Sequence, residues 1–275
     1  FPSINIVFRT SGMTTASRCL LLLLLTAALM QAATSLSAPV KFWTSATCPY
    51  AQRVWCALVE AGVDFELKMV DLRDKSAEFE AAYEAANPGG RSKVPVLQVG
   101  DLTLCESLPV AEYVAEAFAP ALLPETPDRR ALARLLVEAQ PFGTYFTVLR
   151  QRNDAAALSE AVADWTAKLQ HLDEFLRRHA LPGGPFFQGD AFTVCDAAVA
   201  PFAKRAYVTF KHFVDVDLLE LCATSNAPRV AAYLRALIDR DSIKATIADD
   251  DTLIQATAQL LDRMDAAAAS SSSKK

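Results

Sequence analysis

A short β-prone run joins a helical pattern in the segment Val40-Lys-Phe-Trp-Thr-Ser-Ala-Thr-Cys48-Pro-Tyr-Ala-Gln-Arg-Val-Trp55. Residues 40–43 are rich in β-branched and aromatic side chains, which favours a strand. From Tyr50 to Ala61 the apolar residues share one helical face, and Gly62 is a typical residue just past a helix end. Because proline is favoured at the first position of a helix, the Cys48-Pro49 pair predicts that the Cys48 sulfur lies at a helix N-terminus.

A cysteine at a helix N-terminus is a candidate nucleophile. The unpaired amide N–H groups and the helix dipole stabilise a thiolate there, and Arg53, one turn further on, would add positive charge. The motif reads Cys48-Pro-Tyr-Ala51, so it lacks the second cysteine of a Cys-x-x-Cys pair. Cys56 lies about 12 Å further along the helix, too far for a disulfide with Cys48. The alternative for Cys48 is an inert cysteine in a strand-to-helix turn; packing roles are expected for Cys56, Cys105, Cys195 and Cys222.

The segment that follows alternates between strand and helix patterns. The predicted elements are a strand over 64–70, a helix over 76–86, a hairpin with strands over 94–99 and 102–105, and a helix over 107–118. From the residues alone, Val94-Pro95 is expected to be an ordinary trans bond at a strand edge, although an X-Pro bond can be cis. Ser107 is expected to cap the last of these helices. The functional alternative is that Ser107 and free N–H groups bind a carboxylate while Glu106 binds an ammonium.

The second half of the chain predicts helices only. Three prolines in residues 120–127 indicate a linker, and beyond it apolar residues repeat at intervals of three and four. The predicted helices cover 128–150, 154–179, 193–210 and 227–238. Four alanines, four serines and two lysines at the end indicate a disordered tail. We expect an α/β domain over 39–119, a linker over 120–130, an all-helical domain over 131–265 and the tail over 266–275.

The first residues, 1–38, predict a signal or targeting peptide. Residues 20–25 are six consecutive leucines in an apolar run of about 11 residues, the length of a signal-peptide core and too short for a spanning helix. Arg9 and Arg18 precede the run, Met13 is the expected start, and Ala33-Thr-Ser35 offers a cleavage site. The alternative is an anchor that stays attached. We expect entry into the secretory route.

Composition narrows the class of partner. The chain has 275 residues, 52% of them hydrophobic, and 27 basic against 32 acidic residues give a net charge of −5. These values are typical of a globular protein and argue against a nucleic-acid partner, which needs a basic face. Six cysteines in a chain of this length do not make a disulfide scaffold, and we expect no metal site.

Together, these motifs resemble the cytosolic-type glutathione transferases. Within that family the chain looks most like the cysteine-type classes, namely omega, lambda and the dehydroascorbate reductases. The residues that carry the resemblance are Cys48-Pro-Tyr-Ala-Gln-Arg-Val-Trp55, Val94-Pro95, Glu106-Ser107, Gly184–Asp190 and Phe192–Pro201. In the last of these, Thr193 and Asp196 match a helix capping box. The resemblance covers residues 40–245.

The resemblance implies a thioredoxin-like α/β domain followed by an all-α domain, with glutathione held mostly by the first. Cys48 is implied to be catalytic and to form a mixed disulfide with glutathione. The implied glutathione-binding residues are Tyr50, Lys75, Val94, Pro95, Glu106 and Ser107. Pro95 matches the family's cis-proline, and Glu106 with Ser107 matches the clamp on the γ-glutamyl end. Lys75 matches a lysine near the glycyl carboxylate, a role that Lys93 or Arg91 could also fill.

The resemblance also implies a reaction. A cysteine at this position favours thiol–disulfide exchange, hence a glutathione-dependent thiol transferase or dehydroascorbate reductase. The alternatives are a conjugating transferase acting on an electrophile, and a non-catalytic binding module. An electrophile pocket would lie near Phe142, Tyr145, Phe146 and Tyr207, although such clusters are more often core. The family suggests a homodimer. Because this exchange suits a reducing compartment, a plastid reached through the secretory route would reconcile the leader with the reaction.

Overall fold

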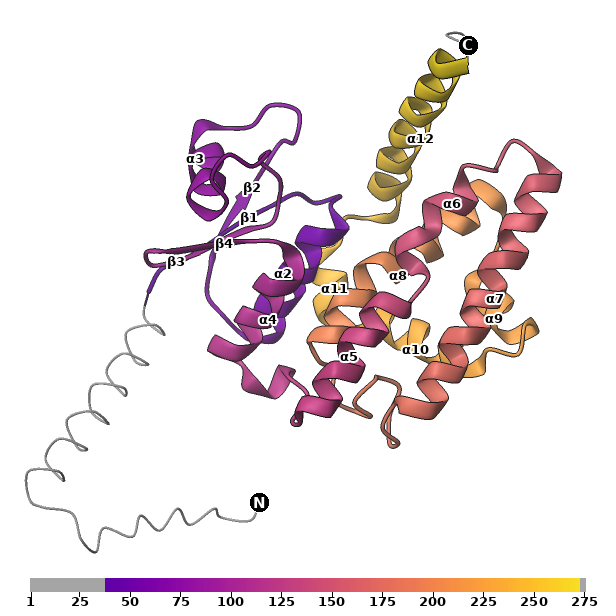
Figure 1. Ribbon diagram of the computed structural model, residues 1–275, viewed down its shortest axis with the longest axis horizontal. Helices are drawn as coiled ribbons and strands as arrows, with labels where there is room; N and C mark the ends of the chain where they lie inside the picture. Colours follow the sequence, from indigo (N-terminus) through magenta and orange to yellow (C-terminus); the bar gives the residue numbers. More distant parts are fainter. Residues whose placement is uncertain (1–37, 273–275) are drawn as a thin grey trace, which may run out of the picture. The chain divides into compact units, whose positions relative to one another are not determined.

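The computed structural model describes residues 38–272, which are coloured in Figure 1. The predicted leader lies outside the described residues apart from its last position. A compact unit begins at Val40 and includes both halves of the remaining chain. No helix in the described part of the chain is both long and apolar enough to cross a membrane.

The N-terminal half is a four-stranded sheet between helices. The strands are β1 (Val40–Thr44), β2 (Glu66–Met69), β3 (Val96–Val99) and β4 (Leu102–Cys105), in the order β2-β1-β3-β4. β1 pairs in parallel with β2 and antiparallel with β3, which pairs antiparallel with β4. The helices are α2 (Pro49–Glu60), α3 (Ala77–Ala86) and α4 (Ser107–Phe118). Figure 1 shows α3 on one face of the sheet and α2 with α4 on the other, which is the predicted thioredoxin-like arrangement.

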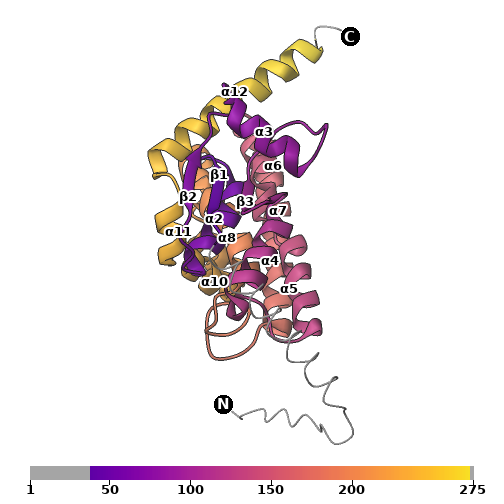
Figure 2. The ribbon, with the colours of Figure 1, turned by 90° about the vertical axis from the view of Figure 1, so that its left-hand side faces the viewer.

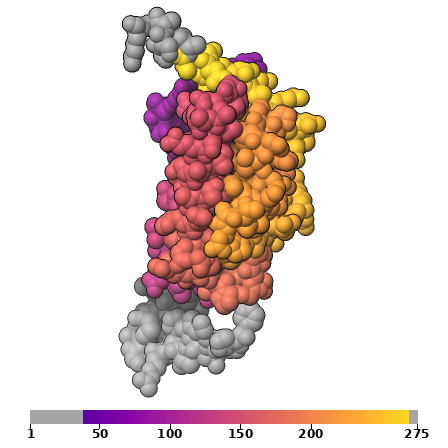
Figure 3. Space-filling view, turned by 90° about the vertical axis from the view of Figure 1, so that its right-hand side faces the viewer, coloured from indigo at the N-terminus to yellow at the C-terminus, as the bar shows by residue number. Residues whose placement is uncertain are grey.

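The C-terminal half is all-helical, as predicted. Its helices are α5 (Pro127–Ala139), α6 (Tyr145–Leu149), α7 (Ala155–His179), α8 (Val194–Val214), α9 (Leu218–Thr224), α10 (Pro228–Asp239), α11 (Asp241–Thr246) and α12 (Asp250–Ser272). α8 lies at the centre and packs against α2, α5, α6, α10 and α12. Figure 3 shows the outer face, where α7 lies beside α9 and α10. The core contains the fully buried rings of Phe142, Trp165 and Phe210.

Three expectations about the helical half are corrected. The helix predicted over 128–150 is broken, because Pro141 has no N–H and disfavours helical backbone at Gln140; α5 ends at Ala139 and α6 starts at Tyr145. α5 also begins inside the linker predicted over 120–130. Finally, α12 continues through Ser272, into the tail predicted over 266–275. Alanine has the highest helix propensity, which explains why the alanine run extends the helix.

Polar contacts from α2 join the two halves. Arg53 Nε donates to the Ala198 carbonyl at 2.8 Å, and Gln52 Nε2 donates to Thr246 Oγ1 at 3.3 Å. At the C-terminal end of α2, Arg240 donates two hydrogen bonds to Glu60, at 2.6 and 2.7 Å. Viewed from the side of the sheet in Figure 2, α2 and α8 lie behind the strands. The N-terminus of α2 is therefore at the junction of the two halves.

Candidate functional site

Cys48 is the residue that precedes α2, as predicted. Its backbone is extended, with φ −83° and ψ 113°, and its side chain makes no capping hydrogen bond. The side chain is half-buried and packs against a cluster that includes Trp43, Ala51 and Val94. Because the sulfur does not cap the helix, it leaves the first-turn N–H groups open to an anion. This is the geometry in which a thiolate or an anionic ligand is stabilised.

Val94 and Pro95 lie beside the loop that carries Cys48. The register pairs Trp43 of β1 with Val96 of β3, so the residues before β3 adjoin the end of β1. The Val94-Pro95 bond is cis, and both residues are buried. The trans bond expected from the residues alone is therefore wrong, whereas the cis-proline implied by the resemblance is present.

Glu106 and Ser107 begin α4, but not with the predicted cap. Glu106 is the N-cap residue, with φ 71° and ψ 119°, and Ser107 is the first helical residue. Ser107 accepts a hydrogen bond at 3.3 Å from Arg53 Nη1, so its hydroxyl belongs to a buried contact. A positive φ at a non-glycine residue costs roughly 1–3 kcal/mol and is found mostly at functional sites and tight turns. The prediction that Ser107 is the N-cap is wrong, because the turn from β4 places the cap position one residue earlier.

Lys75, Lys93 and Arg91 were the candidates for binding the glycyl carboxylate. In the structure Lys75 and Lys93 have different partners. Lys75 donates to the carbonyl and hydroxyl of Ser92, at 2.6 and 3.1 Å, and so braces the loop over 89–93. Lys93 forms an ion pair with Glu106 at 2.7 Å. The hydrogen bond with Glu106 raises the pKa of Lys93. Arg91 is exposed.

Arg53 connects the parts of the site. Its guanidinium lies 4.6 Å from the Phe202 ring centre and 5.4 Å from that of Tyr50, in addition to its hydrogen bond to Ser107. Burial lowers the pKa of Arg53 to about 10, so the side chain stays protonated at neutral pH. Arg53 lies about one turn into the helix that Cys48 precedes. Tyr50 is 53% exposed, with its ring edge-on to Phe202 at 5.1 Å.

The helical half adds two buried titratable groups near the start of α2. Arg205 on α8 and Tyr145 on α6 are buried, and both interact electrostatically with Cys48. Burial lowers the pKa of Arg205 to about 10 and raises that of Tyr145 to about 12, so at neutral pH Arg205 is cationic and Tyr145 neutral. Arg205 Nη1 donates to Gln52 of α2 and to the Pro201 carbonyl.

Arg205 was not among the residues that the sequence predicted for the site. The available signal was a charged residue on the apolar core helix that follows Thr193. Of the aromatic residues proposed for an electrophile pocket, Phe142 is fully buried against Trp165 and belongs to the core. Tyr145 is next to the site, while Phe146 and Tyr207 are only partly buried. Within residues 38–272, no group of three or more metal-ligating side chains is found.

Known proteins are similar to this chain in both of its halves. Residues 47–117 match the family described as Glutathione S-transferase, N-terminal domain, and residues 156–236 match Glutathione S-transferase, C-terminal domain. The chain is 29% identical to the probable glutathione S-transferase DHAR1, cytosolic, of Oryza sativa subsp. japonica, over 77% of this chain and 89% of that protein. It is 27% identical to the chloroplastic glutathione S-transferase L2 of Arabidopsis thaliana, over 78% and 68%. Among solved structures, glutathione transferase Omega 3C from Trametes versicolor superposes with a TM-score of 0.67 at 27% identity, covering 86% of this chain and 97% of that one.

Proposed function

Since the chain belongs to the glutathione transferase family, we propose that it is a cysteine-type member that catalyses glutathione-dependent thiol transfer, with dehydroascorbate as one acceptor. The observation that carries the proposal is the position of Cys48. Its sulfur lies at an uncapped helix N-terminus, and two buried cations lie on or against the same helix, Arg53 within α2 and Arg205 donating to Gln52 of α2. A helix N-terminus is a common position for reactive cysteines, whose thiolate attacks in disulfide exchange. The similarity to an omega transferase and to a DHAR1 protein supports the same subclass.

The proposed reaction has two exchange steps. In the first, the Cys48 thiolate attacks the glutathione sulfur of a glutathionylated substrate. The original S–S bond breaks, the Cys48–glutathione disulfide forms, and the substrate leaves as a thiolate that takes a proton from water. In the second, a glutathione thiolate attacks the glutathione sulfur of that mixed disulfide. Glutathione disulfide leaves, and the Cys48 thiolate is restored.

Dehydroascorbate reduction uses the same residues. Two glutathione molecules lose their thiol protons and two electrons as they join into one disulfide. Dehydroascorbate gains two electrons and two protons and becomes ascorbate. In the first half, the Cys48 thiolate and one glutathione join in the mixed disulfide as two electrons pass to dehydroascorbate, which takes one proton from the glutathione thiol and one from water. In the second half, the other glutathione thiolate attacks the glutathione sulfur of that disulfide, and the Cys48 thiolate is restored.

We assign the glutathione seat to residues around Cys48. The Val94 backbone would pair with the cysteinyl part of the tripeptide, beside the cis Pro95. The γ-glutamyl end would lie at the start of α4, with its ammonium at Glu106 and its carboxylate at the open N–H groups near Ser107. Tyr50 would cover the sulfur from the solvent side, since half of its surface is exposed.

The test compares Cys48→Ser with Cys105→Ser in the full chain. Cys105 is the matched control, because it is the other half-buried cysteine in the described part of the chain. We expect Cys48→Ser to lower both thiol transfer and dehydroascorbate reduction to background, while Cys105→Ser retains both. Wild-type protein treated with glutathione disulfide should gain one glutathione by intact mass, and Cys48→Ser should gain none.

Three results would contradict this assignment. Thiol transfer that survives Cys48→Ser would show that the cysteine is not the nucleophile. Conjugation of glutathione to an electrophilic aromatic substrate by a wild type that lacks thiol transfer would favour a conjugating transferase. Glutathione binding with neither reaction would favour a binding module.

A further inference from the structure

We propose that Lys93 occupies the ammonium position of the γ-glutamyl seat in the free protein and is exchanged for the ligand. On this proposal the seat selects ligands whose ammonium and carboxylate are on the same carbon atom. The inference rests on the proposed function, because it takes glutathione as the ligand. It concerns a residue whose role the sequence left open among three cations.

The Lys93–Glu106 ion pair lies where the ligand ammonium is expected to bind. The register of β3 and β4 pairs Val96 with Cys105, so Lys93 and Glu106 lie at the open end of this hairpin. Lys93 Nζ is 2.7 Å from Glu106 Oε1. Glu106 is the residue expected to bind the ligand ammonium, so a primary ammonium already holds the place that the ligand would need.

The Lys93–Glu106 ion pair can open without disturbing the fold. Its two side chains are 60% and 54% exposed. Exposed ion pairs contribute little net stability, so the Lys93 side chain can leave at small cost. The backbone of the loop is held separately, since Lys75 donates to the carbonyl and hydroxyl of Ser92. Lys93 is therefore a movable side chain on a fixed loop.

Once Lys93 is displaced, the ligand carboxylate is available to it as a new partner. A ligand ammonium on Glu106 brings the carboxylate of the same carbon to the uncapped start of α4. Lys93, released next to that carboxylate, can pair with it. One ion pair is then replaced by two, and only a ligand with both charges completes the exchange. A ligand with the ammonium alone would displace Lys93 and leave it unpaired.

The test measures the binding of three S-methylated tripeptides by calorimetry, so that no disulfide can form. The first is S-methylglutathione. The second has a glutaryl group in place of γ-glutamyl and lacks the ammonium, and the third has a 4-aminobutyryl group and lacks the carboxylate. Each is titrated into full-chain wild type, Lys93→Met and Lys68→Met. Lys68 is the control, because it pairs with Glu66 and Glu78 away from the seat.

The exchange predicts effects of opposite sign in Lys93→Met. The 4-aminobutyryl peptide should bind roughly two- to fivefold more tightly than to wild type, because Glu106 is no longer occupied. S-methylglutathione should bind several-fold more weakly, because its carboxylate loses a partner. The glutaryl peptide should also bind more weakly, because Glu106 is left unpaired and repels the carboxylate of the peptide. Lys68→Met should change none of the three.

Two other calorimetry results would contradict the exchange of Lys93 for the ligand ammonium. If all three affinities fall together, or the 4-aminobutyryl peptide gains nothing, Lys93 does not occupy the seat and the exchange is wrong while the function stands. If wild type binds S-methylglutathione no better than the glutaryl peptide, Glu106 does not hold the ammonium and the exchange is equally wrong. Failure of the proposed function appears elsewhere, as absent thiol transfer by wild type.

Discussion

Helices α2 and α8 lie against each other and begin in opposite ways. At the start of α8, the buried Asp196 carboxylate accepts hydrogen bonds from the Thr193 N–H at 2.9 Å, the Phe187 N–H at 3.2 Å and the Tyr233 hydroxyl at 2.9 Å. At the start of α2, the Cys48 side chain accepts none. The N-terminus of α8, in the helical half, is closed in the sense that a side chain of the protein hydrogen-bonds there. The N-terminus of α2, in the N-terminal half, is open because no side chain caps it.

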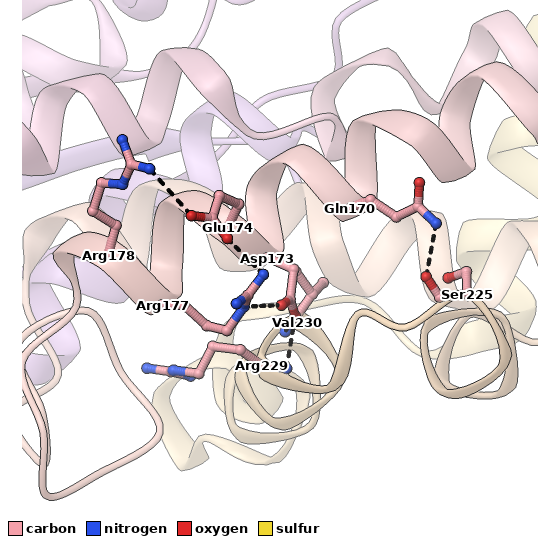
Figure 4. A network of polar contacts seen from close by, with 8 residues as sticks. All are labelled: Gln170, Asp173, Glu174, Arg177, Arg178, Ser225, Arg229 and Val230. Carbon is pink, nitrogen blue, oxygen red and sulfur yellow. Dashed lines mark hydrogen bonds and ion pairs between the residues drawn. The ribbon is translucent and has the colours of Figure 1, made fainter.

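A second closed start in the helical half shows the same pattern. Asp173, on α7, accepts hydrogen bonds from the Arg229 and Val230 N–H groups at the start of α10, at 2.7 and 3.0 Å. Figure 4 shows its carboxylate pointing toward these groups, with Arg177 on its other side. In the N-terminal half, α2 and α4 both begin without a side-chain cap, and the candidate site lies between them. The contrast indicates that an internal cap supports the fold, whereas an open one is available to a ligand.

The largest effect should come from opening the closed start of α8. Asp196→Ala leaves buried donors on Thr193, Phe187 and Tyr233 without a partner. Each unsatisfied buried group costs about 1–3 kcal/mol, so the free energy of unfolding should fall by roughly 3–5 kcal/mol. Urea denaturation measures this, with the exposed Asp164→Ala on α7 as the control. A loss below about 1 kcal/mol would show that the capping box contributes little to stability.

Removing a charge at the open start of α4 should instead affect binding. Glu106→Ala loses a charge-assisted hydrogen bond to the ligand, worth about 1.5–3 kcal/mol, or roughly tenfold or more in glutathione affinity. Stability should change little, and Glu106→Gly should be at least as stable as Glu106→Ala, because glycine adopts a positive φ without strain. Calorimetry and urea denaturation separate the two effects. Unchanged affinity in both folded variants would place the ammonium site elsewhere.

The smallest effects should come from changing a single cap. Ser76 caps α3 by accepting from the Phe79 N–H at 3.3 Å, so Ser76→Ala should cost about 1 kcal/mol of unfolding free energy. Cys48→Ser is its counterpart, because serine is a preferred cap where cysteine makes no capping bond. It should leave stability unchanged or raise it by up to about 1 kcal/mol. A clear loss of stability in Cys48→Ser would mean that the sulfur supports the helix start.

Local signals predicted the N-terminal half well because each element carries its own boundary residues. The predicted helix over 107–118 matches α4, and the predicted hairpin over 94–105 contains β3 and β4. Cys48 was placed at a helix start because Pro49 marks that start independently of tertiary contacts. The break at Pro141 was missed because the apolar repeat continues across it. The short helices α9 and α11 were missed because neither spans enough turns to show a period.

The parts of the site that depend on distant contacts were not predictable. The Val94-Pro95 bond is cis and Glu106 has a positive φ in the folded chain, and neither residue type requires such a conformation. Arg205 lies more than 150 positions from Gln52 in sequence, and its contact with α2 appears only when the two halves pack together. The resemblance supplied the cis-proline, whereas the residues alone favoured trans.

Three buried cysteines can report local unfolding of the chain, because each becomes accessible to an alkylating reagent only when the helices around it separate. Cys56, Cys195 and Cys222 are buried, and burial raises the pKa of Cys56 and Cys222 to about 12. An alkylating reagent at neutral pH should therefore modify Cys48 first and reach these three only when the surrounding helices separate. Because Cys56 is on α2, Cys195 on α8 and Cys222 on α9, the order in which their masses increase would show which helices open first.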